Sequence, residues 1–230
     1  MLIEGSTIAR FIERVNRFCV SVLVRGERRM AHLPNSGRFT ELLVPGRRVV
    51  LVFKSGNRRI TNYDLILVRY GRIWVSVDAR LPPPLFVEAL SLGKLSVFKG
   101  YQLSRREIPY GRSRLDLALS GPQGDCLIET KSVTLVRKNV ALFPDAPTLR
   151  GRRHLEELTH VAQQGIRSAV VFVVQRSDAE AFSPYREADP AFADTMAWAI
   201  DRGVEVYAYA CHVGRHELRI WKRIPVRVSF

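Results

Sequence analysis

Two short runs of residues, Arg114-Leu115-Asp116 and Ile128-Glu129-Thr130-Lys131, carry acidic and basic groups suited to chemistry on phosphate. Apolar and polar residues alternate around both runs, which is typical of strands with one apolar and one polar face. The intervening Gly121-Pro122-Gln123-Gly124 has the composition of a turn. The sequence therefore predicts a β-hairpin that carries these groups.

The register of this hairpin decides which charged side chains face each other. With a loop symmetric about the middle of the turn, Asp116 lies across from Glu129, and Arg114 lies across from Lys131. Directly opposed side chains have Cβ atoms about 4.5–5.5 Å apart, where like charges repel. Two facing carboxylates therefore need a shared proton or a cation between them.

Such a pair of acids beside a lysine is typical of metal-assisted hydrolysis of phosphodiesters. Asp116 and Glu129 would hold Mg²⁺ or Mn²⁺, hard cations that prefer oxygen ligands and keep several waters. Lys131 would position the attacking water and neutralise charge on the phosphate, whereas Thr130 is expected to face the core without a role. The alternative for Glu129-Thr130-Lys131 is a solvated strand edge, but the opposed Asp116 and the basic chain favour a site.

Other charged residues are candidates for a wider site. Glu107, which ends the strand before the hairpin, and Glu88, on a predicted helix, would be outer ligands of the metal or ordinary solvated acids. Five basic residues would contact nucleic acid, or would only pair with acids and solvent: Arg38, Arg112, Arg114, Arg150 and His154. The turn Pro34-Asn35-Ser36-Gly37 would contact nucleic acid or the second domain, or would serve the backbone alone.

An α/β layer with a mixed sheet is expected to position the hairpin, because predicted helices alternate with buried strands. The predicted strands are Leu103–Ile108, Arg114–Leu119, Cys126–Val133, Ser168–Gln175 and Val204–Cys211, and the predicted helices are Leu85–Leu90, Leu149–Gln164 and Pro190–Arg202. Leu81-Pro82-Pro83-Pro84 predicts a linker, since proline interrupts helices and strands. The expected domains are therefore residues 1–80 and 81–230.

Residues 1–80 have the element order of a five-stranded OB-type β-barrel. Three predicted strands, one or two helical turns and further strands follow one another as Thr7–Glu13, Phe18–Val24, Arg28–Leu33, Arg38–Leu43, Arg48–Phe53, Tyr63–Val68 and Ile73–Val77. Small barrels of this kind often bind single strands through a basic face with aromatic residues. The alternative is a barrel that acts only as a spacer.

The charge of the chain indicates a polyanionic partner. The formal net charge is +14, and residues 1–80 hold 15 Lys and Arg against 6 Asp and Glu. We expect DNA, single-stranded or duplex, bound largely without sequence specificity because no helix-turn-helix or zinc finger is visible. A homodimer is left open.

Nothing in the sequence indicates a membrane or an oxidising compartment. The chain has no run of about 20 apolar residues, no basic amphipathic helix and no signal peptide. Its three cysteines have no zinc or disulfide spacing. A cytoplasmic location is expected.

The chain resembles the sugar fermentation stimulation protein family over almost its whole length. The matching segments are Ala31-His32-Leu33-Pro34-Asn35-Ser36-Gly37-Arg38, Ser113-Arg114-Leu115-Asp116, Cys126-Leu127-Ile128-Glu129-Thr130-Lys131-Ser132-Val133-Thr134-Leu135, Phe143-Pro144-Asp145-Ala146-Pro147-Thr148, Arg150-Gly151, His154-Leu155, Glu157-Leu158 and Gly203-Val204-Glu205-Val206. The resemblance implies an OB-type domain followed by a PD-(D/E)xK nuclease-like (restriction-endonuclease-like) domain. It also implies DNA binding and a link to the regulation of sugar (maltose) metabolism.

The resemblance carries Asp116, Glu129 and Lys131 onto the nuclease motif, with Leu115 where the motif has proline. Three hypotheses follow. The first is a DNA-binding protein with a metal site that hydrolyses phosphodiesters, and the second is a DNA-binding transcriptional regulator without chemistry. The third is a metal-independent structural or RNA-associated module that binds through its barrel.

Overall fold

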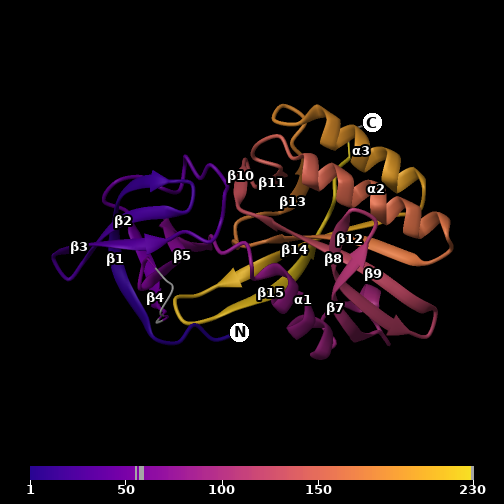
Figure 1. Ribbon diagram of the computed structural model, residues 1–230, viewed down its shortest axis with the longest axis horizontal. Coiled ribbons are helices and arrows are strands. Elements are labelled where there is room, and N and C mark those ends of the chain that lie inside the picture. The colour runs from indigo at the N-terminus through magenta and orange to yellow at the C-terminus, as the bar shows by residue number, and fades with distance from the viewer. Residues whose placement is uncertain (55, 57–59, 229–230) are drawn as a thin grey trace.

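Five strands near the N-terminus close into a small barrel, and a sixth extends it (Figure 1). The computed structural model describes residues 1–54, 56 and 60–228. The strands are β1 (Ser6–Asn16), β2 (Cys19–Val24), β3 (Glu27–His32), β4 (Arg48–Phe53), β5 (Tyr63–Tyr70) and β6 (Ile73–Ser76), in the order β3-β2-β1-β4-β5-β6 with β3 also paired to β5. Buried Val20, Val22, Val49, Leu51 and Leu65 fill the interior. The predicted OB-type barrel is confirmed.

The prediction of one or two helical turns at Arg38–Leu43 holds for one turn. Only a single turn forms, in which the N–H groups of Leu42 and Leu43 both donate to the carbonyl of Phe39. Phe39 has a φ of 53°, a left-handed conformation that prevents a right-handed helix from running through it. Its side chain is buried in the barrel core, which fixes this conformation.

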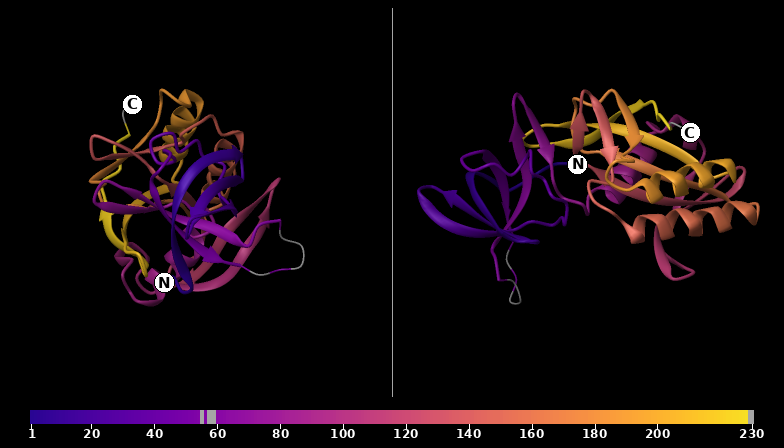
Figure 2. Two further views of the ribbon diagram at one scale, coloured as in Figure 1. Left: turned by 90° about the vertical axis from the view of Figure 1, so that its left-hand side faces the viewer. Right: turned by 90° about the horizontal axis from the view of Figure 1, so that it is seen from above.

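A mixed six-stranded sheet with helices on both faces forms the rest of the molecule, as predicted (Figures 1 and 2). Its strands are β7 (Gln102–Tyr110), β8 (Ser113–Gly121), β9 (Gly124–Val133), β12 (Arg167–Val174), β14 (Glu205–Val213) and β15 (Leu218–Ile224), in the order β15-β14-β12-β9-β8-β7. Strand β12 lies parallel to both β9 and β14, and the remaining neighbours are antiparallel. β15 was not among the predicted strands.

Alternate residues of β12 face opposite layers. Ala169, Val171 and Val173 pack toward α1 (Pro82–Ser91), whereas the residues between them pack toward α2 (Leu149–Gln163) and α3 (Pro190–Asp201). This period of two explains why the strand is apolar at almost every position. A separate small sheet of β10 (Leu135–Arg137), β11 (Val140–Phe143) and β13 (Ala181–Pro184) was not predicted. A short 3-10 helix, η1 (Ser96–Phe98), follows α1.

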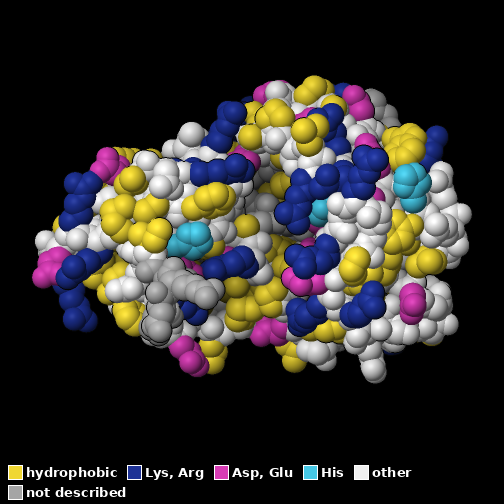
Figure 3. All heavy atoms as spheres, in the orientation of Figure 1, with side chains coloured by type: hydrophobic (Ala, Val, Ile, Leu, Met, Phe, Trp, Pro, Cys, Tyr) yellow, Lys and Arg dark blue, Asp and Glu magenta, His cyan; other side chains and the backbone are white. Residues whose placement is uncertain are grey.

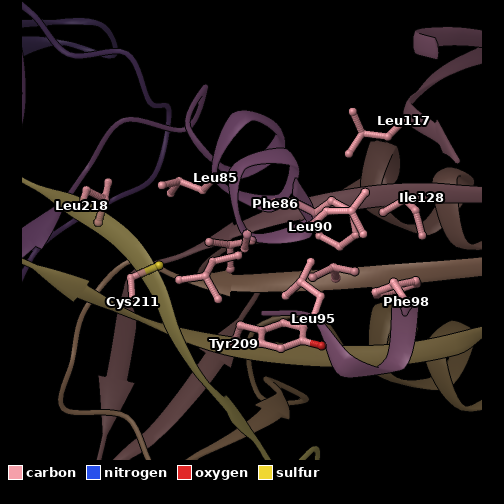
Figure 4. Packing of buried hydrophobic residues seen from close by; sticks show 14 of the residues in the cluster. Leu85, Phe86, Leu90, Leu95, Phe98, Leu117, Ile128, Tyr209, Cys211 and Leu218 are labelled. Carbon is pink, nitrogen blue, oxygen red and sulfur yellow. The ribbon is translucent and has the colours of Figure 1, made fainter. Parts of the chain in front are cut away.

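The predicted proline linker is instead the start of a helix. Pro82 occupies the first turn of α1, where its missing N–H has no helical partner to lose and its fixed φ suits the helix. Leu85, Phe86 and Leu90 then pack into the main core, where the Phe86 ring meets that of Phe98 at a centroid distance of 5.2 Å (Figure 4).

Two residues after β12 attach the sheet to the barrel. The carbonyl of Gln175 accepts the Ser76 N–H (2.9 Å), and its side-chain amide bonds the Ser76 hydroxyl (2.7 Å), the Asp78 carbonyl (3.0 Å) and the Ser132 hydroxyl (2.7 Å). The buried Arg176 places its guanidinium 4.8 Å from the Tyr70 ring centroid. Buried polar groups that are fully paired in this way hold two units in one orientation.

Among the residues that the structure describes, no helix combines the length and apolar character needed to cross a membrane.

Phe86→Ala is expected to lower the free energy of unfolding by about 3–5 kcal/mol, because it removes a fully buried ring and leaves a cavity. Urea denaturation of the two proteins measures the difference. Leu92→Ala, at an exposed position one residue after α1, is the control and should change stability little. Equal effects of both changes would contradict the packing described here.

Candidate functional site

The β8–β9 hairpin has the predicted register. Leu117 pairs with Ile128, Leu119 with Cys126, and Gly121 with Gly124. The backbone pairing stops after Leu117 and Ile128, so neither the expected pairing of Asp116 with Glu129 nor that of Arg114 with Lys131 is formed in the ladder. At this end of the ladder the Asp116 carboxylate takes over the role of a backbone acceptor.

Thr130 is not silent, contrary to the prediction. Its backbone N–H and its hydroxyl both donate to Oδ2 of Asp116, at 2.8 and 2.5 Å. A carboxylate held by two donors has a fixed orientation. Thr130 therefore positions the first acid of the candidate site.

Glu129 is buried, with 3% of its surface exposed, and its two oxygens differ in their surroundings. Oε1 lies 2.6 Å from Nζ of Lys131 and also contacts Nδ1 of His154. Oε2 is buried and has no hydrogen-bond partner among the described residues. A buried carboxylate oxygen without a partner is costly, and a bound cation would remove that cost.

His154 is buried against Glu129 rather than exposed to solvent. It lies on α2, whose first turn is capped by the Thr148 hydroxyl accepting from the Gly151 N–H (3.0 Å). Arg150 Nε donates to His154 Nε2 at 3.3 Å. His154 Nδ1 lies next to both the Glu129 carboxylate and, at 3.0 Å, the Lys131 ammonium, so the ring forms a buried cluster with the acid and the lysine.

The environments of the two acids push their pKa values apart. The pKa of Asp116 is raised, first by burial and then by the negative charge of Glu129. Burial also acts to raise the pKa of Glu129, but the Lys131 ammonium and the hydrogen bond from His154 outweigh it, and the pKa is lowered. Glu129 is therefore the ready anion of the pair, and a cation would favour ionisation of Asp116 as well.

The donor set suits a hard cation. The described residues contain no group of three or more His, Cys, Asp or Glu side chains placed to hold a metal. Mg²⁺, however, commonly binds through one or two carboxylates, with water and substrate phosphate completing its shell. Asp116 and the free Oε2 of Glu129 fit that pattern, whereas no thiol or free imidazole for a softer metal contacts them.

The structure does not bring the two outer acids to this site. Glu88 pairs with the N-terminal ammonium (2.6 Å), which favours the alternative of an ordinary surface acid. Glu107 lies on β7 between Arg106, which pairs with Leu117, and Ile108, which pairs with Leu115. Its side chain is exposed and pairs with Arg114 at 3.3 Å.

Of the five predicted basic residues, Arg150 belongs to the lining of a cleft of about 380 Å³ between the barrel and the α/β unit, whereas Arg38, Arg112, Arg114 and His154 are not among the described lining residues. Arg150 and Lys131 line it from the α/β unit. The backbone N–H of Arg38 donates to the carboxylate of the cleft residue Asp145 (2.8 Å). Arg112 lies in the β7–β8 turn, where its side chain is exposed and its backbone N–H donates to buried Glu157 (3.0 Å). Figure 3 shows this face hollowed between the two units, with Lys and Arg side chains on both rims.

Sequence reasoning gave no role to Asp145 or Glu157. Asp145 holds the Asn35–Arg38 turn, and Glu157 holds the β7–β8 turn through the N–H of Arg112. Glu157 follows His154 by three residues, which places both on one face of α2. This spacing could have indicated that Glu157 lies close to the candidate site. Nothing local marks Asp145, because its partner is 107 residues away.

Asp116→Asn should stabilise the metal-free protein at neutral pH. A raised pKa means that folding is penalised once the carboxyl ionises, so stability falls as pH rises from about 4 through the raised value. The amide oxygen can still accept from Thr130 without this penalty. Thermal melts in EDTA should show a gain in Tm at pH 7 that vanishes below about pH 4.

Asp125→Asn, at an exposed position of the same hairpin, is the control for that measurement and should show no such dependence. A gain for Asp116→Asn that is the same at every pH would mean that ionisation is not its cause.

Comparison with known proteins identifies the family. Residues 12–77 match the SfsA N-terminal OB domain, and residues 80–217 match the sugar fermentation stimulation protein RE domain. A sugar fermentation stimulation protein homolog of Natranaerobius thermophilus is 50% identical over 229 residues (98% of this chain, 94% of the relative), and one of Desulforamulus reducens is 48% identical over 220 (96% and 92%). The structure of Pyrococcus furiosus SfsA in complex with Ca²⁺ superposes with a TM-score of 0.93 at 30% identity, covering 99% of this chain and 98% of that one. The chain therefore belongs to the sugar fermentation stimulation protein family.

Proposed function

We propose that this protein is a divalent-metal-dependent nuclease that binds DNA and hydrolyses its phosphodiester bonds. The observation that carries the proposal is the unpartnered Oε2 of buried Glu129, next to Asp116 and Lys131. A purely binding domain gains nothing from two neighbouring carboxylates beside phosphate, since they repel DNA unless a cation lies between them.

Asp116 and Glu129 would hold Mg²⁺ or Mn²⁺, which would polarise the phosphate and lower the pKa of a bound water. The solved relative from Pyrococcus furiosus is in complex with Ca²⁺, a hard cation with the same preference for oxygen ligands. Thr130 fixes Asp116, and His154 fixes Glu129. These contacts keep both acids oriented before substrate arrives.

Lys131 has a second role in the proposed reaction. Its ammonium contacts Glu129 and also lines the interdomain cleft, so it reaches both the acids and whatever occupies the cleft. A positive group there neutralises charge that develops on the phosphate oxygens. Exposed Arg112 and the cleft residue Arg150 are proposed to hold flanking phosphates.

A second candidate is a DNA-binding transcriptional regulator of sugar (maltose) metabolism without chemistry. One observation favours it: the Lys131 ammonium already balances the charge of Glu129 without a metal. The two candidates differ in whether a divalent cation binds at Asp116 and Glu129.

Metal binding and cleavage test the first candidate. At a hundredfold excess over its Kd, Mn²⁺ should raise the Tm by about 5–10 °C, and Asp116→Asn should abolish this shift. With Mg²⁺ or Mn²⁺, the wild type should cleave single-stranded, duplex or branched DNA, and Glu129→Gln and Lys131→Met should each slow cleavage by about a hundredfold or more.

Asp125→Asn is the matched control and should behave as wild type in both assays. Absence of cleavage on all three DNA forms, together with an equal Mn²⁺ shift in the Tm of wild type and Asp116→Asn, would exclude the nuclease and favour the DNA-binding regulator.

DNA binding is expected to weaken steeply with salt. For duplex DNA, log affinity should fall by about 0.9 per phosphate neutralised for each tenfold rise in salt. Arg112→Ala should make this slope shallower by about 0.9, whereas Arg186→Ala, which removes a guanidinium already paired with Asp194 (2.7 Å), should not. Fluorescence anisotropy over a salt series gives the slopes, and a flat response would exclude the basic surface as the contact.

A further inference from the structure

The lining of the cleft between the barrel and the α/β unit combines polar and basic groups with apolar residues and the acid Asp145. One wall is the barrel turn Asn35–Gly37 together with Arg17, and the other includes Thr148 and Arg150. Thr130, Lys131 and Ser132 also line it, so the cleft runs along the strand that carries Glu129. Hydroxyls, amides and guanidinium groups are the groups that bind sugar–phosphate backbones.

Both walls are held in place by contacts between the two units. Gln175 bonds Ser132, in the cleft lining, and Ser76 of the barrel. On the opposite side, Asp145 holds the N–H of Arg38. Arg14 then bonds the carbonyls of Gly37 (2.6 Å) and Arg17 (2.7 Å) and so joins the turn to the β1–β2 loop. The width of the cleft is therefore a property of the fold.

An exposed aromatic side chain directly follows the cleft residue Arg17 in the chain. Phe18 is 47% exposed, and the guanidinium of cleft residue Arg17 lies 5.4 Å from its ring centroid. The His32 ring lies 6.4 Å from the same ring, and the Leu33 N–H donates to the Phe18 carbonyl (2.8 Å), just before the cleft turn. An exposed ring next to a basic groove is how proteins stack the bases of a single strand.

The volume of this cleft suits a single strand better than a duplex. A cavity of about 380 Å³ is at the small end of those that hold one drug-sized molecule. A duplex carries two backbones and stacked base pairs, with a major groove alone about 12 Å wide. A segment of one strand fits such a volume, and a paired base cannot stack on Phe18.

We infer that this cleft takes a single, unpaired polynucleotide strand, with its backbone against Lys131 and Arg150 and a base stacked on Phe18. This inference rests on the proposed function and narrows its substrate to unpaired strands, such as single-stranded regions or frayed ends. The barrel is then one wall of the substrate site.

Binding by the full-length Asp116→Asn protein in EDTA tests the inference without any cleavage. Labelled single strands of about 12 nucleotides, deoxy and ribo, are compared by anisotropy with a blunt duplex of equal length. We expect at least one of the single strands to bind tenfold or more tightly than the duplex. Whichever strand binds more tightly shows whether the site prefers deoxyribose or ribose. Equal or tighter binding of the duplex would overturn the inference.

Phe18→Ala in the same background should weaken single-strand binding by about fivefold or more, the loss of one base stack, with duplex binding unchanged. Phe53→Ala is the matched control, because Phe53 is an exposed ring of the same barrel (55%) that packs edge-on against Tyr63 and, unlike Phe18, has no chain neighbour in the described lining of the cleft. Equal effects of both variants would contradict the inference.

The two proposals can fail separately. If single-strand binding depends on Phe18 but the protein cleaves no DNA, the single-strand site is supported and the nuclease proposal is contradicted. If the protein cleaves duplex DNA and Phe18→Ala does not affect this cleavage, the nuclease proposal is supported and the single-strand site is contradicted.

Discussion

The antiparallel register of β8 and β9 is the constraint on which the candidate site depends. Side chains alternate between the two faces of a strand, so a slip of one residue would turn each of them to the other face. Pairing of Leu117 with Ile128 is the last step of the ladder, and it leaves Asp116 free to accept from Thr130. The hairpin therefore fixes both acids through backbone geometry, and the buried Leu117 and Ile128 hold that geometry in the core.

The site keeps charge in the interior, where unpaired charge is costly. Lys131 and His154 satisfy one oxygen of Glu129, and the other oxygen is left without a partner. Burial and the nearby Glu129 also raise the pKa of Asp116. Groups that destabilise a fold in this way are common at functional sites, where stability is given up for chemistry. The surrounding sheet supplies the stability that this arrangement loses.

Much of the architecture could be predicted from local patterns. Alternation predicted β8 and β9, continuous apolar runs predicted β12 and β14, and the stretches that form α2 and α3 were predicted as helices. The differences came where local signals allowed two outcomes. The proline run Pro82-Pro83-Pro84 starts a helix as readily as it interrupts one, and the left-handed Phe39 limits the predicted helical turns to one because its ring is held in the barrel core.

The sequence by itself determined the hairpin, its turn and its register, because neighbouring residues and a period of two are sufficient for them. It therefore also determined that Lys131 shares a face with Glu129. Only the tertiary structure decided that His154 reaches Glu129 from 25 residues away and that Asp145 holds the Arg38 turn from 107 residues away. Such contacts leave no periodic trace, because they depend on how α2 and the barrel pack against the sheet. The cleft exists for the same reason, because its walls come from two units that are joined by long-range contacts such as those of Gln175 and Arg176 with the barrel.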